Sequence, residues 1–224
     1  MNLKINKNLA SHQIIKHFVA PALLFSAAVA VSFGYPMKVS NIGKTIGTAE
    51  YSQKVSGGKV TKYLSIKTTN HGKTSVVSDT TVYNSAGTPL SDSFFTQFGA
   101  NSVHLAITYT STAAIVHGTF NGKSISRKVL LPKGASMANP SNVWFITRKP
   151  SANQIIVATV FDTQNLQWVN HTVSYRGDQT ITIDGKSVLS HRLYDQENGG
   201  DQELWLNSSG QLLRYASNGI LIQK

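Results

Sequence analysis

The chain has 224 residues, of which 41% are hydrophobic and 14% charged, with no cysteine and a net charge of +11. Without cysteine, disulfides, thiolate catalysis and a lipid-modified N-terminal cysteine are excluded. The basic residues are spread singly or in pairs, without interleaved aromatic residues, which predicts a solvated basic surface and argues against nucleic acid as a partner.

Residues 1–30 have the order of a secretory signal peptide. A stretch with three lysines and no acidic residue is followed by an apolar run over residues 18–33, and residues 28–30 read Ala-Val-Ala, a small-x-small cleavage site. The alternative is an uncleaved N-terminal anchor helix, with membrane association through residues 18–33. The run of about 16 residues is shorter than the ~20 that a spanning helix needs, so cleavage is favoured.

Either way, the sequence predicts export to the periplasm or the medium. Three lysines lie in the leader, so residues 31–224 retain 18 basic and 10 acidic residues, a net charge of +8. About 190 residues suffice for one domain held by core burial. Since no Pro/Ser-rich linker divides residues 31–224, we expect a single antiparallel β domain.

Beyond the leader, the sequence is dominated by β-forming residues in alternating apolar and polar order. This period of two predicts strands with one buried and one solvated face. Residues 90–98 carry three phenylalanines at a spacing compatible with a short helix or an aromatic strand. The clearest alternating segments are residues 47–52, 60–66, 73–83, 103–116 and 118–131.

Two-residue turns separate several of these segments. Asn-Gly, Asp-Gly and Gly-Gly pairs favour type I′ hairpins, because both central residues need positive φ. The turns are expected at residues 57–58, 121–122, 184–185 and 218–219. Residues 132–150 form the one long irregular connection, which we expect to pack a short helix against the sheet. In total, the sequence predicts ten to twelve strands in a sandwich or a barrel-like sheet.

No motif in the sequence indicates catalysis. The histidines beyond the leader lack metal-binding spacing, no Gly-x-Ser-x-Gly elbow is present, and each histidine is interpreted as a strand surface residue. The acidic loop over residues 195–203 offers oxygen ligands for calcium, but its spacing misses the EF-hand pattern, so a solvated hairpin loop is favoured. We therefore predict no enzyme activity, no metal site and no cofactor.

Several C-terminal sequence segments resemble the closing strands of bacterial periplasmic proteins of unknown function, which are themselves similar to the lipoprotein-carrier (LolA and LolB) half-barrel. The similarity spans residues 119–217 and extends more loosely from residue 45. The similarity is clearest at residues 184–186, 203–207 and 210–215. Residues 139–145 and Pro150 lie where those proteins place helical cover over the sheet. The resemblance implies one strongly curved antiparallel sheet, a half-barrel or open barrel, whose concavity holds acyl chains in the carriers.

These observations predict an exported, non-enzymatic protein of the cell envelope that binds a hydrophobic or amphipathic ligand, such as a lipid or a lipoprotein. Trp144, Phe145, Trp168, Trp205 and Tyr215 are the candidate ligand-binding residues, because binding sites are concave and mostly apolar. The alternative is a structural or accessory subunit that docks an envelope protein partner through a sheet edge or an aromatic patch.

Overall fold

The computed structural model describes the chain except for residues 1–30, 71, 138–149, 198–199 and 209. Its fourteen strands are β1 Val31–Asn41, β2 Lys44–Ser56, β3 Lys59–Asn70, β4 Lys73–Asn84, β5 Pro89–Phe98, β6 Asn101–Thr110, β7 Ala113–Phe120, β8 Lys123–Leu130, β9 Ile155–Asp162, β10 Gln167–Ile183, β11 Lys186–Glu197, β12 Gly200–Leu206, β13 Leu212–Ser217 and β14 Ile220–Gln223. The residues described contain no helix, and hence none that could cross a membrane.

All fourteen strands form one antiparallel sheet that does not close. Its spatial order runs from β8 down to β1, and then from β14 down to β9. β1 pairs with β14, so the first and last strands meet in the middle of the sheet. The two open edges are therefore β8 and β9, which are consecutive in sequence and are separated by the long connection.

The predicted all-β antiparallel sheet is confirmed, although it has fourteen strands where ten to twelve were expected. Residues 90–98, left open between helix and strand, lie in β5. The predicted helical cover falls mainly on residues 138–149 and the leader on residues 1–30, both outside the described residues. The flanks that are described, 131–137 and 150–154, contain no helix.

The predicted two-residue turns are confirmed by their backbone geometry. Asn121 and Gly122 have φ of 48° and 76°, and the other three turns repeat this pair of positive values. Positive φ at both positions is the signature of the type I′ turn, whose twist matches that of paired strands. Eight consecutive strands, β1 to β8, can therefore follow one another as a meander with short connections.

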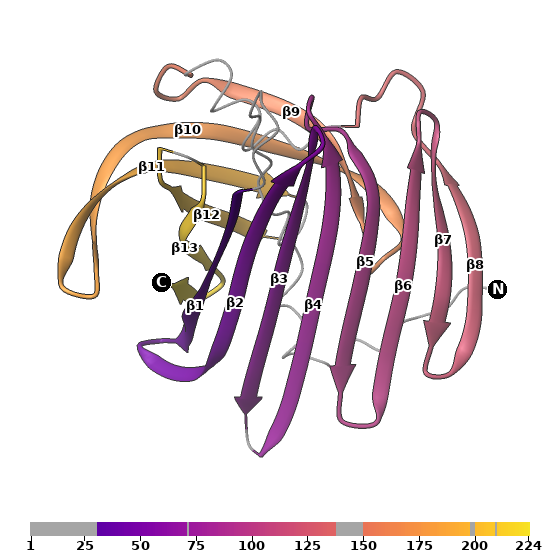
Figure 1. Ribbon diagram of the computed structural model, residues 1–224, viewed down its shortest axis with the longest axis horizontal. Coiled ribbons are helices and arrows are strands. Elements are labelled where there is room, and N and C mark those ends of the chain that lie inside the picture. The colour runs from indigo at the N-terminus through magenta and orange to yellow at the C-terminus, as the bar shows by residue number, and fades with distance from the viewer. Residues whose placement is uncertain (1–30, 71, 138–149, 198–199, 209) are drawn as a thin grey trace.

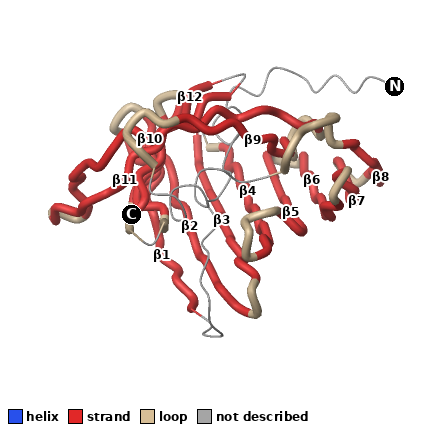
Figure 2. The backbone as a smooth tube through the Cα atoms, turned by 90° about the horizontal axis from the view of Figure 1, so that it is seen from above, coloured by secondary structure: helices blue, strands red, loops and turns tan. Residues whose placement is uncertain are grey.

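The sheet bends back on itself, so that β9–β12 lie across one face of the β1–β8 half (Figures 1 and 2). The 17-residue strand β10 contributes to this bend, because its register with β11 shifts between Tyr175 and Gly177. Gly177 has a φ of 97°, which residues with a side chain rarely adopt. We call the face that the bend encloses the inner face.

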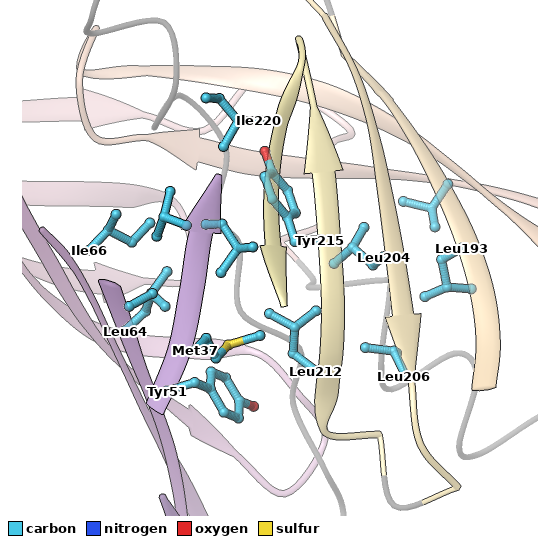
Figure 3. Close-up of a cluster of buried hydrophobic side chains, with 14 of the residues drawn as sticks. Met37, Tyr51, Leu64, Ile66, Leu193, Leu204, Leu206, Leu212, Tyr215 and Ile220 are labelled. Carbon is cyan, nitrogen blue, oxygen red and sulfur yellow. The ribbon is translucent and has the colours of Figure 1, made fainter. Parts of the chain in front are cut away.

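Most of the inner face is a closed apolar core. Met37, Tyr51 and Leu64 from β1–β3 point toward Leu206 and Leu212 from β12 and β13 (Figure 3). The last two leucines are fully buried. A buried Leu contributes about 1.5–3 kcal/mol relative to exposure, so this cluster supplies much of the stability of a chain without disulfides.

A second apolar cluster joins the two open edges. Phe161 of β9 and Trp168 of β10 pack against β4–β8, with ring centroids 5.1 Å apart. The indole N–H of Trp168 donates to the carbonyl oxygen of Val129 on β8 at 3.2 Å. The edges are thus connected through side chains without being paired as strands.

Candidate functional site

Four polar side chains interrupt the apolar inner face on four neighbouring strands. Gln53 lies on β2, Lys62 on β3, Asp79 on β4 and Asp92 on β5. Each occupies an inward position of its strand, because side chains two residues apart share a face. We call these four residues the inner polar cluster.

Strand register sets their spacing. Gln53 is directly opposite Lys62, and Thr81 is opposite both Lys62 and Asp92 on its two sides. Asp79 lies two residues from Thr81 on β4, so it is the diagonal neighbour of Lys62 and of Asp92. The cluster is therefore a continuous row in which donors on β2 and β3 are followed by carboxyl groups on β4 and β5.

The row is buried and incompletely hydrogen-bonded. Gln53 and Lys62 are each 1% exposed and Asp92 is 7% exposed. Four solvent-inaccessible side-chain atoms of the row have no hydrogen-bonding partner among the described residues. They are Gln53 Nε2, Lys62 Nζ, Asp79 Oδ1 and Asp92 Oδ1. Buried polar groups are nearly always paired, so four such atoms in one row mark an unusual place in the fold.

Burial also shifts the protonation equilibria of the cluster. Desolvation lowers the pKa of Lys62 well below its usual value. Desolvation raises the pKa of Asp79, and it raises the pKa of Asp92 further because the Asp79 charge is adjacent. The two carboxyl groups are hydrogen-bonded to each other, and Asp92 also accepts a hydrogen bond from the Tyr109 hydroxyl. Burial of two adjacent carboxyl groups therefore favours retention of a proton by the pair.

Apolar side chains surround the row on the same face. Leu64 follows Lys62 on β3, Phe94 is directly opposite Asp79, and Ile107 is directly opposite Asp92. Leu64 belongs to the main apolar core, whereas Phe94 and Ile107 belong to the cluster beneath the open edges. The polar row thus lies where the two apolar clusters meet, an arrangement suited to a molecule with one polar and one apolar part.

The residues predicted as a ligand site are not brought together. Tyr215 is 3% exposed and packs in the main core on the inner face (Figure 3). Trp205 points to the opposite face of the sheet, where Arg192 and Arg214 stack on its ring at 5.6 and 5.5 Å. Its indole N–H donates to Gln179 Oε1 at 2.8 Å.

Trp168 lies in the cluster beneath the open edges, away from Trp205 and Tyr215. Trp144 and Phe145 lie outside the described residues. The aromatic residues predicted as one site are therefore divided between the two faces of one sheet. Period-two alternation alone does not show which face each residue occupies, because that depends on the strand register.

Trp168 also lines a hollow of about 740 Å³ between residues 132–136 and strands β9 and β10. The polar groups of this hollow bond to one another. Asp162 accepts hydrogen bonds from the backbone N–H groups of Gln164 and Asn165, and Thr159 donates to Asn170. These bonds shape a turn and a strand pair, so the hollow is a weaker candidate than the inner polar cluster.

Two histidines form carboxylate pairs. His171 is 1% exposed and both oxygens of Asp195 lie 3.0 Å from its Nδ1, so its interpretation as a surface residue was wrong. His191 pairs with Asp178 at 2.5 Å, and hydrogen bonds from Tyr175 and His191 lower the pKa of Asp178. Asp195 belongs to the predicted acidic loop, and no group of metal-binding residues occurs in the part of the chain that is described.

Sequence reasoning missed the inner polar cluster, but a signal for it was present. Residues 60–66 place Lys62 at an inward position between Val60 and Leu64. A charge at an apolar position of a strand is uncommon, because lysine is almost never fully buried without a partner. The same holds for Asp92, which precedes the inward Phe94 by two residues.

Comparison with known proteins supports the fold and indicates no activity. No protein-family profile and no curated protein matches the chain. A β-barrel-like protein of the domain of unknown function DUF1849 from Brucella abortus is similar with a TM-score of 0.58 and 12% identity, over 90% of this chain and 97% of that one. A DUF1089 family protein from Pseudomonas aeruginosa has a TM-score of 0.39 and 10% identity, over 89% and 95%.

Neither structure is described as a lipoprotein carrier. The predicted resemblance therefore holds for an open, barrel-like antiparallel sheet and extends no further. The chain shares that architecture with a protein from a domain family of unknown function, and the architecture is compatible with ligand binding on an enclosed face.

Proposed function

We propose that this chain is an exported, non-enzymatic binding protein of the bacterial envelope, which takes an amphipathic molecule such as a lipid onto its inner face. The polar part of the ligand meets the inner polar cluster. The apolar part lies along the side chains around Phe94 and Ile107, which border the cluster on the same face.

The observation that supports this proposal is the set of four buried polar atoms left without partners. A buried donor or acceptor without a hydrogen bond costs about 1–3 kcal/mol, and a charged group costs more. Natural proteins retain such a cost mainly at functional sites. A ligand that brings complementary polar atoms to Lys62 and Asp92 would remove it.

Absence of catalysis is part of the proposal. A hydrolytic site needs a nucleophile or activated water beside a base poised near its working pH. In the inner polar cluster desolvation favours the protonated form of the carboxyl groups and the neutral form of the lysine, which suits recognition of a polar group better than turnover.

The proposal is tested by ligand binding to the full chain after purification and removal of bound lipid. A single-chain phospholipid with a sixteen-carbon acyl chain and its six-carbon analogue are titrated by calorimetry below their critical micelle concentrations. We expect the long chain to bind at least about tenfold more tightly, since each buried CH₂ contributes about 0.8 kcal/mol. Equal affinity, or no binding of either probe, would reject amphipath binding.

A second function, docking of an envelope protein partner, is favoured by the two open edges. Leu130 at the end of β8 and Ile155 and Val157 on β9 are 66%, 62% and 62% exposed. Outside the sheet β9 makes an isolated bridge between Thr159 and Met137. Exposed apolar residues on edge strands are features of strand-addition interfaces. This function predicts that Val157→Lys lowers the mass of a complex isolated at native expression levels, whereas unchanged mass would reject it.

A further inference from the structure

Donors and acceptors are segregated along the inner polar cluster. The unpartnered atoms of Gln53 and Lys62, on β2 and β3, are nitrogens that donate hydrogen bonds. The unpartnered atoms of Asp79 and Asp92, on β4 and β5, are carboxyl oxygens. Since strands lie about 4.8 Å apart, the centres of the two sides are about 10 Å apart at the backbone, and the side chains can converge from there.

This segregation restricts the polar group that can fill the site. A simple anion would satisfy Gln53 and Lys62 but would approach the two carboxyl groups. A simple cation would satisfy the carboxyl groups but would leave Lys62, whose Nζ lies 6.0 Å from the centre of the Tyr83 ring, without a hydrogen-bond acceptor. A group with an anionic end and a separate N–H-bearing cationic end satisfies all four residues in one orientation.

Resting on the proposed function, we propose that the inner polar cluster recognises a zwitterion made of a primary ammonium and a nearby phosphate or carboxylate. The anionic end accepts hydrogen bonds from Gln53 and Lys62, and the ammonium donates to Asp79 and Asp92. Charge-assisted hydrogen bonds of this kind are about twice as strong as neutral ones and fix the orientation of the ligand.

The surroundings are consistent with this assignment. The Gln53 Oε1 already accepts a hydrogen bond from the Tyr51 hydroxyl at 3.0 Å, so the amide nitrogen of Gln53 is the end that remains for a ligand. Asp92 is hydrogen-bonded to the Tyr109 hydroxyl and to the Asp79 carboxyl group, and its Oδ1 is among the buried atoms without a hydrogen-bonding partner in the described residues. Ligand charges at both ends would return Lys62 and the carboxyl groups toward their ionised forms.

The zwitterion can be a lipid headgroup or a free solute, and matched probes distinguish the two. Lysophosphatidylethanolamine carries the primary ammonium, lysophosphatidylcholine carries a cation without N–H, and lysophosphatidylglycerol is anionic. With identical acyl chains, we expect the ethanolamine lipid to bind at least about tenfold more tightly than the other two, the equivalent of one charge-assisted hydrogen bond. Water-soluble phosphoethanolamine is expected to compete only at much higher concentration.

Variants test the residues themselves. Lys62→Met and Asp92→Asn preserve side-chain size. Asp92→Asn is expected to remove the preference for the ethanolamine lipid, because Asp92 receives the ammonium, whereas Lys62→Met is expected to weaken all three lipids by a similar factor, because each carries the phosphate that Lys62 contacts. Lys67→Met is the matched control, because Lys67 is exposed on the same strand. Circular dichroism confirms that each variant is folded, and Asp92→Asn provides the independent arm if Lys62→Met is not.

The outcomes separate this inference from the proposed function. Equal affinity for the three lipids, or an unchanged preference for the ethanolamine lipid in Asp92→Asn, overturns the zwitterion assignment while amphipath binding stands. Phosphoethanolamine binding as tightly as its lipid supports the zwitterion assignment and overturns the amphipath. If no probe binds, both proposals fail.

Discussion

The inner face has two regions with opposite chemistry. Over β1–β3 and β10–β14 it is filled by apolar side chains, among which Val39, Leu193 and Ile222 are completely buried (Figure 3). Over β2–β5 the same face carries the inner polar cluster, in which Gln53, Lys62 and Asp92 are also buried and Asp79 is half-buried. One region gains free energy from burial, whereas the other loses free energy because its buried polar atoms lack partners.

The two regions differ in what explains them, and this points to the polar region as the functional part of a sheet that carries no catalytic motif. A packed apolar region explains why the chain folds, and any apolar replacement of similar size preserves it. A buried polar row that destabilises the fold has no such explanation. Mutations in the two regions should therefore have opposite effects on stability.

The largest effect is expected in the apolar region. Leu206→Ala removes a fully buried side chain, and creation of a cavity should lower the free energy of unfolding by about 3–4 kcal/mol. Urea denaturation followed by tryptophan fluorescence measures it. Leu189→Ala is the control, because Leu189 is 59% exposed, and it should change stability by less than about 0.5 kcal/mol. Equal losses would show that the main core is not closed.

The opposite sign is expected in the polar region. Lys62→Met replaces a desolvated amine without a hydrogen-bonding partner by an apolar side chain of similar length, which should raise the free energy of unfolding of the ligand-free protein by about 1–3 kcal/mol. Lys67→Met on the outer side of the strand should be nearly neutral. A destabilised Lys62→Met would mean that the amine stabilises the fold, and the contrast between the two regions would be lost.

The carboxyl pair should make stability depend on pH in a defined direction. Because the pKa values of Asp79 and Asp92 are raised on folding, the folded state binds more protons than the unfolded state above about pH 4. The pair contributes its full stabilisation at pH values below the pKa of the unfolded state. The free energy of unfolding then falls as pH rises toward the pKa of the folded state, by up to about 1.4 kcal/mol per pH unit for each extra proton that the folded state binds. Asp92→Asn should reduce this slope.

Thermal unfolding of wild type and Asp92→Asn between pH 4 and pH 7 isolates the effect, because groups away from the cluster titrate alike in both. Lys62 and Tyr109 face the same row, and Lys62 opposes the carboxyl pair. The pKa of Tyr109 is raised above the ordinary tyrosine value. Lys62 has a lowered pKa, so its contribution has the other sign, with stability rising as pH increases toward the unfolded lysine value. Parallel pH profiles would contradict a shared proton.

Much of the fold was predictable from local signals. Asn121-Gly122 and Asp184-Gly185 fix their turns by the demand for positive φ, and alternation fixes the strands between them. Pairing of β1 with β14 was not predictable, because the residues that meet are about 180 positions apart and neither strand has a turn that joins them. The edges at β8 and β9 follow only from that pairing.

The site was harder to predict for a related reason. Lys62 and Asp92 are recognisable as charges at inward positions, but only the register through Thr81 places them in one row. Trp205 and Tyr215 were grouped because both are large and aromatic. Strand parity separates them, since Trp205 alternates with Leu204 and Leu206, which point into the core.

The smallest effect is expected on the outer face, where Trp205→Phe tests the aromatic site predicted from sequence against the inner polar cluster. Loss of the hydrogen bond to Gln179 should lower the free energy of unfolding by about 0.5–1.5 kcal/mol. Lipid affinity measured by calorimetry should change by less than about twofold, because the ring points away from the inner face. A loss of affinity comparable to that of Lys62→Met would place the ligand on the outer face, and the buried polar row would then require a different explanation.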